Sequence, residues 1–155
     1  MPSRGMLLRI AGAGAGAAML TAALSGTASA GEQSVAAGAN FKIHRAGTSS
    51  CLDSNTGGDV YTLTCNGGRN QVWTNYAPGK FRNLATNACL AASRTAVFTT
   101  TCSSNTTDWT TSSTTNKYVK NVQTGLCLNN SGGTPEAVGV RICHAPTALW
   151  TMERV

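Results

Sequence analysis

The sequence has few charged residues, at 12% of its 155 positions, and few aromatic residues, at 6%. Its 12 lysines and arginines give a net charge of +6, but they are scattered singly along the chain without a cluster. A nucleic-acid-binding protein needs a concentrated basic patch, so we expect no nucleic-acid partner. No segment shows sustained helical periodicity, and runs of β-branched and aromatic residues dominate, which predicts an all-β chain.

Residue types that carry out catalysis or hold metal ions are also scarce. The two histidines, His44 and His144, have no motif around them, and nothing marks a nucleophile. A glycosidase would need two carboxylates facing one bond, and the 6 acidic residues offer no such pair. We therefore expect no enzyme. Structural zinc favours cysteine pairs two to four residues apart, and no such pair exists here, so we expect neither a metal nor a cofactor.

The amino-terminal 30 residues have the order of a secretory signal. Arg4 and Arg9 provide a basic start, an uncharged run follows, and Ala28-Ser29-Ala30 offers a cleavage site. The uncharged run is too short for the ~20 residues that cross a bilayer, and no other stretch is longer or more apolar, so we expect no membrane attachment. The prediction is a secreted, extracellular protein with a signal over 1–30, a flexible leader over 31–40 and one domain over 41–155.

A unit made of Cys-Leu, a second cysteine and Trp-Thr occurs three times. The leading cysteines Cys51, Cys89 and Cys127 are 38 residues apart in both steps (89−51 and 127−89). A fixed period of this size indicates one supersecondary unit used three times, over about 41–76, 77–113 and 114–155. An even number of cysteines in an exported chain indicates disulfides. If each unit folds alike, the pairs are Cys51–Cys65, Cys89–Cys102 and Cys127–Cys143.

The tryptophans of the three units, Trp73, Trp109 and Trp150, stand at equivalent points of the repeat. Each unit contains about four short strands and cannot bury its apolar face alone, so the units must pack together. Closing the strands into a barrel removes exposed sheet edges. We therefore expect the tryptophans to lie in a shared core near a pseudo-threefold axis.

Units of this kind resemble the ricin-type β-trefoil lectin family, whose signature in each unit is Gln-x-Trp. The first unit has it as Gln71-Val72-Trp73, whereas the others read Thr107-Asp108-Trp109 and Ala148-Leu149-Trp150. The resemblance extends from Phe41 to the carboxyl terminus. It implies a β-trefoil, that is, a six-stranded barrel capped by three hairpins. It also implies a carbohydrate-binding module for a galactose- or xylose-type glycan, and we expect a monomer.

In this family an acid follows Cys-Leu, an aromatic residue precedes the second cysteine by two, and an amide precedes the glutamine of the signature. The first unit has Asp53, Leu63 and Asn70 in these places, followed by Gln71. Leu63 is not aromatic, but Tyr61 lies two residues earlier and shares its face of the strand. We expect all five residues to form one sugar site, with Tyr61 as a displaced platform. The alternative for Asp53 is a turn residue that bonds nearby backbone N–H groups.

The other two units match the family's site pattern poorly. The second has Ala91, Thr100 and Thr106 at the three positions, which predicts no site. The third has Asn129, Arg141 and Thr147, where Asn129 retains some hydrogen-bonding capacity. Because one fold can host many functions, a degenerate trefoil that binds a protein or inhibits a protease is the alternative to a lectin.

Overall fold

The computed structural model describes residues 37–113, 115–130 and 135–155, and strands dominate within them. The predicted secretory signal, residues 1–30, lies outside the described residues. No helix in the described part is long and apolar enough to cross a bilayer. A backbone hydrogen bond joins Gly38 to Asn75, so paired residues begin inside the segment 31–40 that was expected to be a leader.

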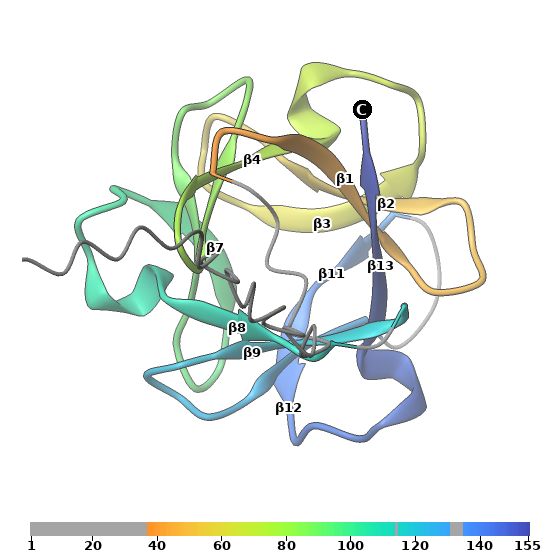
Figure 1. Ribbon diagram of the computed structural model, residues 1–155, viewed down its shortest axis with the longest axis vertical. Coiled ribbons are helices and arrows are strands. Elements are labelled where there is room, and N and C mark those ends of the chain that lie inside the picture. The colour runs from red at the N-terminus through yellow and green to blue at the C-terminus, as the bar shows by residue number, and fades with distance from the viewer. Residues whose placement is uncertain (1–36, 114, 131–134) are drawn as a thin grey trace, which may run out of the picture. The chain divides into compact units, whose positions relative to one another are not determined.

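Each of the three units contributes a strand, a hairpin, a short 3₁₀ helix and a tryptophan-bearing strand, arranged around a common centre (Figure 1). The first unit contains β1 (Asn40–Arg45), β2 (Ser50–Ser54), β3 (Val60–Thr64), η1 (Arg69–Gln71) and β4 (Val72–Ala77). The second contains β5 (Lys80–Asn83), β6 (Cys89–Ala92), β7 (Val97–Thr100), η2 (Asn105–Thr107) and β8 (Trp109–Thr111). The third contains β9 (Lys117–Asn121), β10 (Cys127–Asn129), β11 (Glu136–Ala137), β12 (Gly139–Arg141), η3 (Pro146–Ala148) and β13 (Leu149–Arg154).

The first and last strands of the units form the barrel. Strand β1 pairs with β4 and β13, β4 pairs with β5, and β9 pairs with β8 and β13, all antiparallel. Figure 1 shows β1 and β13, which come from opposite ends of the domain, side by side. The ring closes between β5 and β8, where the N–H of Trp109 donates to the carbonyl of Gly79 at 2.9 Å. The predicted barrel of six strands is therefore confirmed.

Glycine is required at the point where the ring closes. Gly79 has a φ of 74°, in the left-handed region that L side chains rarely adopt. A Cβ placed on Gly79 would lie 2.5 Å from the carbonyl oxygen of Trp109, closer than real contacts allow. The absence of a side chain at this position therefore lets the two strands approach and hydrogen bond.

Three hairpins cap the barrel, formed by β2 with β3, β6 with β7, and β10 with β12. The sequence predicts one strand over residues 137–142, but the structure divides this stretch at Val138. Strand β11 pairs with β3 of the first unit, whereas β12 pairs with β10 of its own hairpin. Val138 is 5% exposed and belongs to the core, so the backbone changes partner where this side chain turns inward.

The disulfides and the tryptophans occupy equivalent positions in the three units. The bridges are Cys51–Cys65, Cys89–Cys102 and Cys127–Cys143, which confirms the predicted pairing within each unit. The exposed fractions of Trp73, Trp109 and Trp150 are 0%, 2% and 0%, which confirms their place in the core. Each indole N–H donates to the carbonyl of the leucine that follows its unit's first cysteine, at 2.9 to 3.0 Å. The Cys-Leu and Trp-Thr parts of the repeat are therefore joined directly by a buried hydrogen bond.

Candidate functional site

The hairpin of the first unit places the predicted acid opposite the predicted aromatic residue. Asp53 on β2 and Tyr61 on β3 are direct cross-strand partners. Val60 and Thr62 are buried, whereas Tyr61 and Leu63 are half-buried, so the last two share the outer face as expected. Asp53 is only 4% exposed, so it is nearly enclosed by its neighbours.

The hydroxyl of Tyr61 and the carboxylate of Asp53 form one electrostatic unit. Burial raises the pKa of Tyr61 most, and the negative charge of Asp53, the hydrogen bond to its carboxylate and the charge of Asp59 raise this pKa further. Tyr61 is therefore a neutral phenol at physiological pH and donates to Asp53. The carboxylate has about four lone-pair sites, so one donated bond leaves acceptor capacity for a ligand's hydroxyl groups.

Asn70 lies on η1, beside the end of β2. Its Nδ2 donates to the carbonyl of Ser54, the residue after Asp53, at 2.6 Å. The backbone carbonyl of Asn70 accepts a hydrogen bond from Nδ2 of Asn83, which belongs to the second unit, at 2.7 Å. The side-chain amide of Asn70 is thus held next to the acid by Ser54, and the backbone of Asn70 is held by the neighbouring unit.

Gln71 lies behind this site and faces the protein interior. Its side chain is 0% exposed. Its Oε1 accepts from the N–H of Asn66 at 2.8 Å, and its Nε2 donates to the carbonyl of Thr64 at 3.1 Å. Both polar ends of Gln71 therefore hold the loop that leads to Asn70, and this residue positions the site from within instead of facing a ligand.

Leu63 occupies the position at which the family has an aromatic residue. It is half-buried and pairs with Cys51 across the hairpin. Its aliphatic side chain extends the outer face beyond Tyr61 but offers no aromatic surface. Stacking against a sugar ring therefore depends on Tyr61.

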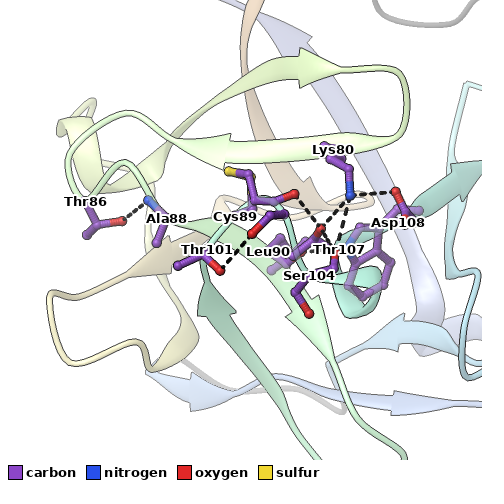
Figure 2. Close-up of a disulfide and its surroundings, with 12 residues drawn as sticks. Lys80, Thr86, Ala88, Cys89, Leu90, Thr101, Ser104, Thr107 and Asp108 are labelled. Atoms are coloured by element: carbon purple, nitrogen blue, oxygen red, sulfur yellow. Dashed lines mark hydrogen bonds and ion pairs between the residues drawn. A yellow bond between two sulfur atoms is a disulfide. The ribbon is translucent and has the colours of Figure 1, made fainter.

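The second unit lacks the acid, and a polar cluster of Lys80, Thr107 and Asp108 takes the place of the signature glutamine (Figure 2). Nζ of Lys80 donates to Oγ1 of Thr107 at 2.8 Å and pairs with Oδ1 of Asp108 at 2.8 Å. Thr107 in turn donates to the carbonyl of Ser104, as Gln71 does to its own loop. The sequence analysis missed this cluster, because Lys80 lies on the unit's first strand and no short-range pattern links it to Thr107. The side chain at the acid position, Ala91, is buried and apolar.

In the third unit the acid and amide positions bond to each other. Oγ1 of Thr147 donates to Oδ1 of Asn129 at 2.7 Å, and Asn129 is 4% exposed. The hydrogen-bonding capacity that Asn129 retains is therefore partly used inside the protein. The same bond demonstrates that the fold brings these two positions of a unit within hydrogen-bonding distance.

Within residues 37–113, 115–130 and 135–155, no group of three or more histidine, cysteine, aspartate and glutamate side chains is placed to hold a metal ion. The cysteines of this region are all in disulfides. The chemistry that the first unit offers is hydrogen bonding by a carboxylate and an amide beside an aromatic ring.

Comparison with solved structures identifies the same architecture. The designed threefold-symmetric protein ThreeFoil has a TM-score of 0.67 at 16% identity, covering 75% of this chain and 99% of its own. The Macrolepiota procera ricin B-like lectin, solved in complex with lactose, has a TM-score of 0.67 at 17% identity, with coverages of 78% and 99%. The C-terminal half of the earthworm R-type lectin, solved with GalNAc, has a TM-score of 0.64 at 17% identity, with coverages of 76% and 99%.

A search of curated proteins gives no match. At these identities the structural likenesses show the fold alone. The family model of the ricin-type beta-trefoil lectin domain matches residues 39–150, which include all three disulfides and all three tryptophans. The chain therefore belongs to the ricin-type β-trefoil lectin domain family.

Proposed function

We propose that this domain binds carbohydrate through one site in its first unit, formed by Asp53, Tyr61 and Asn70. The observation that carries the proposal is the cross-strand pairing of Asp53 with Tyr61, next to the anchored amide of Asn70. A carboxylate accepts hydrogen bonds from two adjacent sugar hydroxyls, and an amide bonds a neighbouring one. The ring of Tyr61 covers the apolar C–H side of the sugar.

The ligand class in this proposal is a galactose-type glycan, with a xylose-type glycan as its competitor. Two similar structures were solved with lactose and with GalNAc, and both of these sugars contain a galactose-type ring. A single site gains nothing from multivalency, so the affinity for one sugar is expected to be weak. The domain acts as a binding module without catalysis and as a monomer.

The proposal also assigns the protein to the outside of the cell. Disulfides persist in oxidising compartments, and the three bridges support export, together with the signal-like order of residues 1–30. Expression in a secreting host followed by amino-terminal sequencing tests this assignment. A mature chain that begins at Gly31 is expected, and retention in the cell with an intact amino terminus would contradict it.

The first experiment is a glycan array followed by titration of the purified domain with galactose and with xylose. Asp53→Asn keeps the shape of the side chain but removes the charge, and we expect it to weaken binding by about tenfold or more. Asn70→Ala is expected to act in the same direction. Thr106→Ala, at the amide position of the second unit, is the matched control and leaves binding unchanged.

Two results would end this proposal. One is an array without a single bound glycan, and the other is full sugar affinity in the Asp53→Asn protein. Inhibition of a protease panel by a domain that binds no glycan would instead favour the protein-binding scaffold, which family membership does not favour.

A further inference from the structure

A hollow lies on the pseudo-threefold axis, where the three hairpin caps meet. Strand β3 pairs with β11 from the third unit, and Asp59 forms a bridge with Phe98 from the second. In Figure 1 the strands β3, β7 and β11 lie around the middle of the domain. The hollow has a volume of about 560 Å³, within the range of small-molecule sites.

The floor of this axial hollow follows the threefold repeat. Val60, Val97 and Val138 each stand five residues before the second cysteine of their unit. They line the hollow and are 4%, 7% and 5% exposed. All three belong to the core cluster, so the floor is apolar and fixed by packing beneath it.

The walls of the axial hollow break the threefold symmetry. The residue after each floor valine is Tyr61 in the first unit, Phe98 in the second and Gly139 in the third. Tyr61 and Phe98 line the hollow and are half-buried. Two aromatic side chains therefore flank an apolar floor, and the third unit lines the hollow with Pro135, Glu136 and Ala137.

The charged residues that line the axial hollow are both acidic, although the chain as a whole is basic. They are Asp59 and the half-buried Glu136. Asp59 is oriented by Asn55, whose Nδ2 donates to Oδ2 of Asp59 at 2.9 Å and whose Oδ1 accepts from the N–H of Asp59 at 3.1 Å.

We propose that the axial hollow binds a small organic cation, an ammonium group on a compact apolar body. Aromatic faces attract such cations through their quadrupoles, carboxylates at the rim neutralise the charge, and the valine floor covers the alkyl groups. This site adjoins the proposed sugar site and shares the Tyr61 ring with it, but Phe98, Asp59 and Glu136 belong to the hollow alone, and neither Asp53 nor Asn70 lines it. The proposal therefore does not depend on carbohydrate binding.

The test compares two probes of nearly equal shape, choline and its uncharged counterpart 3,3-dimethyl-1-butanol. Each is titrated into the purified domain while the methyl signals of Val60, Val97 and Val138 are followed by NMR. Choline is expected to shift these signals with an affinity about three- to tenfold higher than that of the neutral alcohol. Equal affinities for the two probes, or no shift of the valine methyls with choline, would overturn the proposal.

Variants locate the site and separate it from general effects of charge. Phe98→Leu and Asp59→Asn are each expected to weaken choline binding by about three- to tenfold. Tyr76→Leu removes an exposed aromatic ring elsewhere, and Glu153→Gln removes an exposed carboxylate on β13. Both controls keep wild-type affinity, and their folding is checked through the dispersion of the same spectra. A control that weakens choline binding as much as its partner variant would contradict the assignment to the axis.

Discussion

Gly79 offers a sharp test of how the barrel closes. In the Gly79→Ala protein the new Cβ would lie 2.5 Å from the carbonyl oxygen of Trp109, so the backbone of β5 or β8 must move. This movement lengthens the 2.9 Å hydrogen bond between the N–H of Trp109 and the carbonyl of Gly79. The left-handed conformation adds its own cost, because alanine rarely adopts a φ of 74°.

The magnitude follows from four contributions. Holding alanine in the left-handed region costs about 1–2 kcal/mol, and the lower entropy of the unfolded chain offsets about 0.4–1 kcal/mol of this. Relieving the clash costs about 1–3 kcal/mol, as in other overpacked sites, and weakening the hydrogen bond costs about 1 kcal/mol. We expect the free energy of unfolding to fall by about 2–6 kcal/mol.

A second glycine provides the matched control. Gly125 has a φ of 71°, but a Cβ on it would meet nothing within 4 Å. Gly125→Ala therefore carries the conformational cost alone, about 1 kcal/mol or less. Urea unfolding of both variants with disulfides intact measures the difference, which we expect to be about 2–4 kcal/mol, or roughly 8–16 °C in Tm. Equal destabilisation of the two variants would refute the steric reasoning.

Three further predictions concern the first unit. The pKa of Tyr61 in the folded protein lies above its ordinary value of 10.0, so the contribution of Tyr61 to the free energy of unfolding is complete below pH 10.0 and is lost as the pH rises toward the folded-state pKa. A titration followed by tyrosinate absorbance should show one phenol that ionises at a higher pH than the others. This ionisation should move to lower pH in the Asp53→Asn protein. Trp73→Ala is expected to lower the free energy of unfolding by about 3–5 kcal/mol, and a loss of sugar binding with unchanged melting would contradict the core assignment. Gln71→Ala should cost about 1–3 kcal/mol and weaken sugar affinity without removing a ligand contact, which calorimetry on the folded variant can check; full sugar affinity would argue against a positioning role.

The architecture was predictable because it is repeated within the chain. Equivalent positions of the cysteines and tryptophans predicted the disulfides and the buried core, and both are confirmed. The pairing of Asp53 with Tyr61 follows from the alternation of strand residues and the turn between them. These features depend on local order that each unit carries in its own sequence.

Other features depend on contacts between segments that no short-range pattern links. Lys80 reaches Asp108 across 28 residues (108−80), and its role in replacing the signature glutamine appears only when β5 and η2 lie together. Likewise, the partner change at Val138 reflects pairing with β3, which belongs to a different unit. The sequence analysis placed Gln71 in the sugar site next to Asn70, but its side chain is 0% exposed and faces the protein interior.

The hydrogen bond from Asn83 to the carbonyl of Asn70 has a consequence for how the repeat works. The strand that opens the second unit fixes the loop on which the first unit's amide lies. Asn121, from the third unit, does the same for the carbonyl of Thr106 at 2.8 Å. A peptide that contains the first unit alone would carry Asp53, Tyr61 and Asn70 but would lack the side chain from the next unit that holds the backbone of Asn70 in place. The first and second units are thus each completed by the unit that follows, so repetition of the unit along the chain fixes the loops that one copy alone would leave unsupported.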